Sequence, residues 1–93
     1  MAGIAGQEAL GLLETRGYAA LVEATDCALK AANVELVSWE RVGSALVTAL
    51  FLGDVAAVTT AIEAGASAAS KVGDLVSKHI IPNPHETIAT LVR

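Results

Sequence analysis

Residues 34–54 read VELVSWERVGSALVTALFLGD, and this stretch predicts two strands joined by a short loop. Residues 34–42 are rich in β-branched side chains and alternate in polarity, while 45–52 form a continuous apolar run of strand length. Gly43 and Ser44 lie between the two runs. We therefore predict a β-hairpin whose loop contains small residues.

The sequence before the hairpin predicts a strand and then a helix. Apolar side chains at odd and even positions of 7–15 predict a strand that is covered on both faces, and Gly17 ends this run. The period becomes helical over 18–33, where Asp26 and Lys30 have the spacing of an ion pair on a helix surface. The buried side of this helix is predicted to contain Leu21, Ala24, Ala28 and Ala32.

The sequence after the hairpin predicts a second helix and a last strand. Asp54 is a good N-cap because its carboxylate can accept hydrogen bonds from amides of the first turn, and Gly73 predicts a left-handed end to the helix. Residues 75–81 have the pattern of a strand, which the two prolines in 82–84 end, and we expect a short tail helix over 85–93. The buried face of the second helix is predicted to contain Val55, Val58, Ile62, Gly65, Ala69 and Val72.

This order predicts a ferredoxin-like βαββαβ sandwich, an α+β fold with a four-stranded antiparallel sheet, two helices on one face and a short C-terminal helix. Small residues at the contact positions let the helices lie close to the sheet, so we expect a thin, flat molecule. At 93 residues the chain has room for one domain. We expect a flexible leader over 1–6, the folded domain over 7–85 and a C-terminal tail over 86–93.

The composition predicts self-association. Apolar residues make up 54% of the chain but aromatic residues only 3%, so most apolar side chains are small. Small side chains bury less area than aromatic ones, and a short chain buries a smaller share of its surface on folding. A monomer would therefore leave apolar surface in water, and large exposed apolar patches usually mark a contact with another molecule.

Several classes of partner fit the sequence poorly. The longest apolar run, 45–52, is shorter than the roughly 18 residues that a membrane-spanning helix needs, and the first residues do not resemble a secretory signal. Six basic residues against ten acidic ones, with no basic cluster, disfavour nucleic acid. Cys27 has no second cysteine to pair with, which fits a reducing compartment. We expect a cytoplasmic protein with no membrane or nucleic-acid partner.

Candidates for catalysis or metal binding are few. His79 and His85 are the two histidines, and we expect structural or contact roles for both. Neither HxxxH nor CxxC spacing occurs, and Cys27 is expected to be a small packed side chain, so we predict no metal site. No phosphate-binding glycine motif occurs either. The remaining candidates are scattered carboxylates with no pair suited to acid–base chemistry: Glu8, Glu14, Glu40 and Asp74. We therefore predict no catalytic residue and no cofactor.

Six short motifs occur in order between residues 8 and 85. They are EALG near the start, D-x-x-x-K-x-A-x-V through the first helix, VGS in the hairpin loop, LVTA, GDVAAV, and I-P-x-P-H after the last strand. Any one of them is weak, but six in register are specific. On these motifs the chain resembles the single-domain, hexamer-forming shell proteins of bacterial microcompartments.

The resemblance implies a flat cyclic hexamer in which the hairpin loop lines a pore on the sixfold axis. The matching residues here are Arg41, Val42, Gly43, Ser44 and Ala45. Each residue appears once per subunit around a closed axis, so Ser44 would supply a ring of hydroxyl groups and amides. Ala45 stands where the family usually has a second glycine. An ordinary tight hairpin is the alternative interpretation of this loop.

The resemblance also implies contacts between neighbouring hexamers. Lys30 and Asn33 match the family's edge lysine and asparagine, and their spacing predicts that they share a helix face. Asn83 stands where the family has an arginine between two prolines, followed by Pro84 and His85. We expect all five residues to make hexamer-edge contacts.

The function implied by the resemblance is structural and not enzymatic. A homo-hexamer would pack with neighbouring shell hexamers and other shell proteins around encapsulated enzymes in the bacterial cytoplasm, and small polar metabolites would cross its pore. Leu52 stands where the family often has arginine, and its role is open. The alternative is a ferredoxin-like oligomer that binds a metabolite and regulates an enzyme. It explains the apolar excess equally well, but not the loop, the edge pair and the P-x-P-H sequence together.

Overall fold

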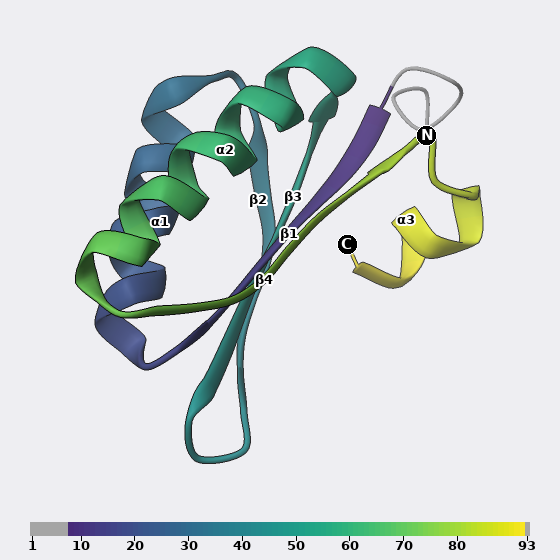
Figure 1. Cartoon of the computed structure of the whole chain (residues 1–93). Helices are drawn as coiled ribbons and strands as arrows, with labels where there is room; N and C mark the ends of the chain where they lie inside the picture. The colour runs from purple at the N-terminus through teal and green to yellow at the C-terminus, as the bar shows by residue number, and fades with distance from the viewer. Residues whose placement is uncertain (1–7, 93) are drawn as a thin grey trace.

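A computed structural model describes residues 8–92, and the predicted leader over 1–6 lies outside this range. The order of elements is the predicted βαββαβ arrangement with a short C-terminal helix (Figure 1). The elements are β1 (Glu8–Arg16), α1 (Tyr18–Ala31), β2 (Glu35–Val42), β3 (Leu46–Asp54), α2 (Val55–Val72), β4 (Asp74–Pro82) and α3 (Glu86–Val92).

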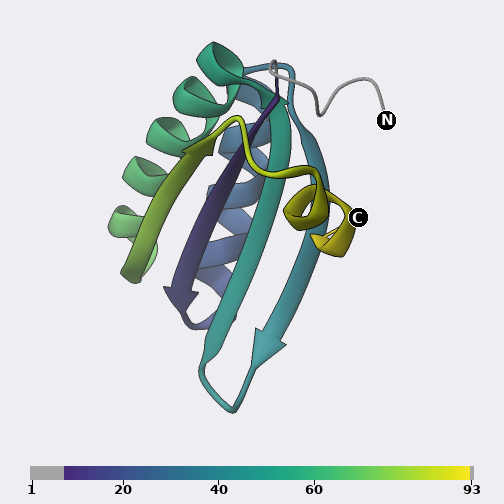
Figure 2. The same ribbon diagram turned by 90° about the vertical axis from the view of Figure 1, so that its right-hand side faces the viewer.

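The four strands form one antiparallel sheet in the order β2-β3-β1-β4. Helices α1 and α2 cover one face of the sheet, and α3 lies on the opposite side (Figure 2). The molecule measures 35 × 26 × 15 Å. The prediction of a thin, flat molecule is therefore confirmed.

The core lies between the sheet and the two long helices. Phe51, Leu13 and Leu21 are its largest buried side chains, and alanines fill most of the remaining helix contacts. A Cβ added at Gly65 would lie 2.7 Å from Leu13 Cδ1 and 3.0 Å from the carbonyl oxygen of Ala24. The absence of a side chain at this position of α2 thus lets the helix approach both β1 and α1 closely.

Strand β1 is covered on both faces, as predicted. A Cβ added at Gly11 would lie 2.7 Å from Ile62 of α2, so this position faces the helices. Its neighbour Leu10 points to the other face, where it pairs with Leu52 of β3, and these side chains are 3% and 1% exposed. Leu52 therefore occupies a buried apolar site on the α3 side of the sheet.

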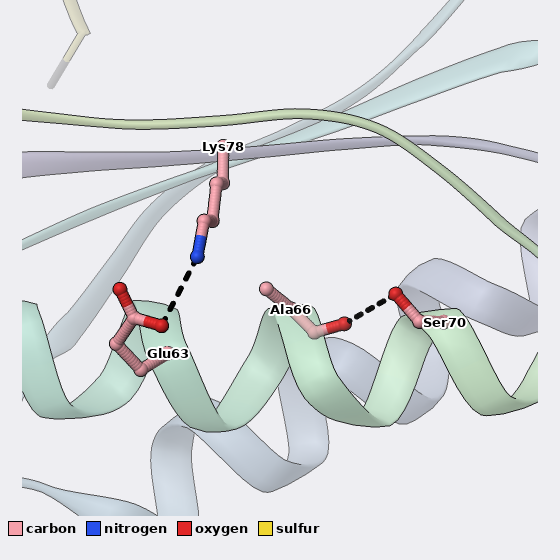
Figure 3. A network of polar contacts seen from close by, with 4 residues as sticks. All are labelled: Glu63, Ala66, Ser70 and Lys78. Carbon is pink, nitrogen blue, oxygen red and sulfur yellow. Dashed lines mark hydrogen bonds and ion pairs between the residues drawn. The ribbon is translucent and has the colours of Figure 1, made fainter.

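The edge strand β4 is fastened to α2 by a polar contact. Lys78 Nζ lies 3.0 Å from a carboxylate oxygen of Glu63 (Figure 3). Farther along α2, the hydroxyl of Ser70 donates to the carbonyl oxygen of Ala66 within the same helix. Both side chains of the ion pair are about half exposed, so this contact adds little to the stability of the fold.

Two predictions about α2 are wrong. Val55 and Val72 are 43% and 50% exposed, although their helical angle places them on the buried face. They lie in the terminal turns of an 18-residue helix that packs against the 14-residue α1, and this position leaves them uncovered. Gly73 is not left-handed either, because its φ of −166° is extended. A Cβ there would lie 3.3 Å from that of Ala20, so close packing favours the glycine.

The N-cap prediction for α2 is confirmed. The carboxylate of Asp54 accepts a hydrogen bond of 2.8 Å from the amide of Ala57. Within 8–92, no helix is long and apolar enough to cross a membrane.

Candidate functional site

The β2–β3 hairpin places all five predicted pore residues at one end of the sheet. Val42 and Leu46 are the last paired residues of the two strands, so Gly43, Ser44 and Ala45 form the turn. Gly43 has a φ of +68°, a left-handed conformation that favours glycine. Residues 41–45 are exposed, and the hairpin extends beyond the helices in Figure 1. The loop is thus the most protruding part of the sheet.

The base of the hairpin is fastened to the start of α1. The amide of Gly17 donates to the carbonyl oxygen of Ala45 over 2.8 Å. The guanidinium of Arg41 lies over the ring of Tyr18, 5.1 Å from its centroid. These contacts connect both strands of the hairpin to one helix end, so the loop is supported at its base although its tip is exposed.

An aromatic pair, Tyr18 and Trp39, links the base of the hairpin to the middle of α1. The rings of Tyr18 and Trp39 meet edge to face with centroids 5.0 Å apart, and Trp39 Nε1 donates to the hydroxyl of Thr25 over 3.2 Å. Sequence reasoning missed this chain of contacts. One signal was present, because Trp39 and Arg41 are two apart in an alternating strand and must share a face.

A cavity of about 380 Å³ lies between the hairpin and the start of α1. Its lining includes Arg16, Tyr18, Arg41, Ser44 and the buried Val47. A guanidinium nitrogen of Arg16 lies 3.8 Å from a carboxylate oxygen of Asp74, and both side chains are more than half exposed. Such an exposed, long ion pair is weak.

Lys30 lies in the last turn of α1, where it is exposed and paired. Its Nζ is 2.9 Å from a carboxylate oxygen of Asp26, as the spacing predicted. The hydrogen bond to Asp26, together with the negative charge of that carboxylate, raises the pKa of Lys30 above its ordinary value. Lys30 is therefore a permanent cation at neutral pH, at the end of the sheet away from the hairpin.

Asn33 is not on the helix face that it was predicted to share with Lys30. Helix α1 ends at Ala31, and Ala32 has an extended backbone with φ of −157°. The chain turns toward β2 at this point, and a Cβ added at Gly53 would lie 3.2 Å from the carbonyl oxygen of Asn33. Asn33 is exposed in the connection that follows the helix.

The third group of edge candidates lies in the turn after β4. Asn83 has a φ of +54°, and its amide donates to the carbonyl oxygen of Glu8 over 3.1 Å. Pro84 is buried. His85 Nδ1 accepts from the amide of Thr87 over 3.1 Å, so the imidazole caps the start of α3. Asn83 and His85 are exposed.

The sheet register separates the loop from the edge candidates. Leu52 near the end of β3 pairs with Glu35 at the start of β2 and Leu10 at the start of β1, and Leu10 pairs with Ile81 at the end of β4. Lys30 and the two asparagines therefore lie at the end of the sheet opposite the hairpin. They are not brought together, because β2 and β4 are opposite edges of the sheet.

The other titratable candidates do not converge. His79 is exposed on β4, and Glu14 on β1 accepts from the hydroxyls of Thr48 and Ser77 on neighbouring strands. The thiol of Cys27 lies 3.7 Å from the carboxylate of Glu23, and partial burial together with that negative charge raises its pKa. In the part of the chain that the structure describes, no three His, Cys, Asp or Glu side chains are grouped to hold a metal ion.

This chain is similar to known shell proteins of bacterial microcompartments. A family model for the BMC domain matches residues 9–84. The chain is 55% identical over 78 residues to the bacterial microcompartment shell protein EutM of Salmonella typhimurium, which covers 84% of this chain and 81% of that protein. It is 49% identical over 86 residues to the shell protein PduA of Citrobacter freundii, covering 92% of each.

Two further matches extend the comparison. The carboxysome shell protein CcmK2 of Synechocystis is 48% identical over 82 residues, which cover 86% of this chain and 80% of that protein. A microcompartments protein from Desulfitobacterium hafniense has a solved structure that superimposes with a TM-score of 0.85 at 35% identity and 92% coverage of this chain. The match spans 47% of that longer chain, about half its length. These matches favour the shell interpretation over a metabolite-binding regulator.

Proposed function

Because the chain belongs to the BMC domain family, we propose that it is a non-enzymatic shell protein that forms cyclic hexameric tiles with the hairpin loop around a central pore. The observation that carries this proposal is the placement of the loop and the edge candidates at opposite ends of one sheet. In a closed ring one end of each protomer faces the axis and the other faces outward. An elongated protomer with such ends fits a tile.

The chemistry of the hairpin suits the axis. Gly43 has no side chain and those of Ser44 and Ala45 are small, so six copies can approach without closing the opening. Ser44 and the exposed turn would present hydroxyl and peptide groups to the channel, which favours small polar metabolites. Arg41 is held back against Tyr18 at the base of the loop.

Exposed apolar side chains support contacts between neighbouring protomers in the ring. Val22, Leu29, Leu36 and Trp39 line a groove of about 330 Å³ between α1 and β2, and Leu29 is 42% exposed. Val76 on the opposite edge strand is also 42% exposed. A ring covers both flanks of every protomer, so it would bury the surface that the monomer leaves in water.

The outer end of the protomer is proposed to meet neighbouring hexamers and other shell proteins. Lys30 and Asn33 lie beside one sheet edge, and Asn83, Pro84 and His85 beside the other, so a tile would carry both groups on its perimeter. We place the shell domain over 7–85 and treat 86–93 as a tail. The tile would enclose enzymes within the bacterial cytoplasm.

Solution mass tests the hexamer. Light scattering should give a mass about six times the 9.4 kDa of the chain, and a stable monomer or dimer would refute the ring. Leu29→Lys places a charge in the apolar groove and should lower the hexamer fraction. Thr60→Lys, which adds the same charge on the exposed surface of α2, is the matched control and should not. Equal loss in both variants would assign the effect to net charge.

A further inference from the structure

We propose that the cavity between the hairpin and the start of α1 binds a small oxyanion, a carboxylate or phosphate group. The cavity lies within one protomer, and its volume of about 380 Å³ falls in the range of small-molecule pockets, roughly 300–1,000 Å³. Arg16 and Arg41 line it, which places two of the six Lys and Arg residues of the chain at one site in a protein of net charge −4. Both charged residues of the cavity lining are therefore basic, although the chain as a whole is acidic.

Arg41 is positioned to bind an anion. Its guanidinium rests over the Tyr18 ring, and among the described residues it makes no ion pair with a carboxylate. A planar guanidinium against an aromatic face keeps its N–H groups available in the plane, where they match the two oxygens of a carboxylate or phosphate. Ser44 also lines the cavity, and its hydroxyl can serve as a further donor.

Little within the cavity competes for these donors. None of its lining residues is acidic, and the first turn of α1 beside it contains no Asp or Glu. Arg16 pairs with Asp74, which is not part of the lining, over 3.8 Å, and both side chains are exposed. Because such a pair is weak, an oxyanion inside the cavity can share the Arg16 guanidinium with Asp74 or replace Asp74 as its partner.

The site goes beyond the shell function and needs only the single chain. Any effect of the site on metabolites that cross the pore rests on the proposed function, since a bound oxyanion would lie at the base of the proposed pore loop. The inference can therefore fail while the hexamer stands, and the reverse is also possible.

Calorimetric titration with inorganic phosphate and, separately, acetate tests the site at constant ionic strength. We expect saturable binding of at least one of the two. Arg41→Gln should weaken it about tenfold, as loss of a charge-assisted bidentate contact implies, and Arg16→Gln should weaken it as well. Lys71→Gln removes the same charge from the last turn of α2, away from the cavity, and should leave the affinity unchanged.

Two outcomes would overturn the proposal. One is the absence of saturable binding by either anion, and the other is equal weakening by Lys71→Gln and Arg41→Gln. Arg41→Lys, which keeps the charge but loses the planar fork, should weaken binding less than Arg41→Gln, and thermal melts will confirm that each variant is folded. Light scattering on the same samples separates the two hypotheses: a hexamer without binding refutes the site, and a monomer that binds refutes the ring.

Discussion

A single methyl group added at Gly65 probes the close packing that makes the protomer thin. The new Cβ would lie 2.7 Å from Leu13 Cδ1, 3.0 Å from the Ala24 carbonyl oxygen and 3.5 Å from the Ala28 Cβ. Leu13 can rotate away, but the Ala24 oxygen belongs to the backbone, so α1 and α2 must separate. Overpacking of this kind costs about 2–3 kcal/mol, while alanine returns about 1 kcal/mol of helix propensity. We expect Gly65→Ala to lower the free energy of unfolding by about 1–2 kcal/mol.

Urea unfolding followed by circular dichroism measures this change, at one fixed protein concentration because assembly stabilises the folded state by mass action. Ser67 lies exposed on the same helix, so Ser67→Ala compared with Ser67→Gly gives the propensity contribution alone. If Gly65→Ala proves more stable than the parent by that same amount, no steric conflict exists, and the reasoning about close helix packing is wrong.

Three further changes test other parts of the account. Trp39→Phe keeps a ring against Tyr18 but removes the hydrogen bond to Thr25, so urea unfolding should show a loss of about 0.5–1.5 kcal/mol, and no loss would contradict the bond. The raised pKa of Cys27 keeps its thiol protonated at mildly alkaline pH. Iodoacetamide should therefore react more slowly with the parent protein than with the Glu23→Gln variant, which lacks the nearby charge. Equal rates would contradict the contribution of Glu23. Asn83→Arg should increase sheet or tube formation seen by electron microscopy, at a cost of about 1 kcal/mol because a left-handed φ suits asparagine better, and unchanged assembly would mean that the edge is set elsewhere.

The order of elements could be predicted because local sequence patterns determine it. Alternation and apolar runs define the strands on either side of Gly43, and Asp54 marks the start of α2 by its capping chemistry. The end of α1 could not be predicted in the same way. Alanines favour a continued helix up to Asn33, but the backbone becomes extended at Ala32 as the chain turns into β2. Tertiary geometry overrides helix propensity there.

The position of the hairpin loop could be predicted from the sequence, but the contacts that support the loop could not. The hairpin sequence marks residues 41–45, whereas the contacts of Arg41 with Tyr18, and of Trp39 with Thr25, join segments that come together only when α1 packs on the sheet. Helical angle likewise assigned Val55 to the buried face, because angle carries no information on where a neighbouring element ends.

The thinness of the protomer and the exposure of its flanks have one physical origin. Alanine and glycine at the helix contacts bring α1 and α2 close to the sheet, so the enclosed core is small for the apolar content of the chain. Larger apolar side chains such as Val22, Leu36 and Val76 remain at the flanks, where a ring of copies would cover them. In the proposed ring, the partner of this surface is a second copy of the chain.

Cross-linking most directly tests the claim that the hairpin faces the axis of a closed ring. In a Cys27→Ala background, Ser44→Cys places a thiol on the loop, and Asn33→Cys places one at the opposite end of the sheet as the matched control. With dilute, isolated assemblies and a short bis-maleimide, the Ser44→Cys protein should give a ladder of linked protomers up to six, and the Asn33→Cys protein should remain single chains. Ladders from Asn33→Cys with none from Ser44→Cys would place the hairpin outside and contradict the account.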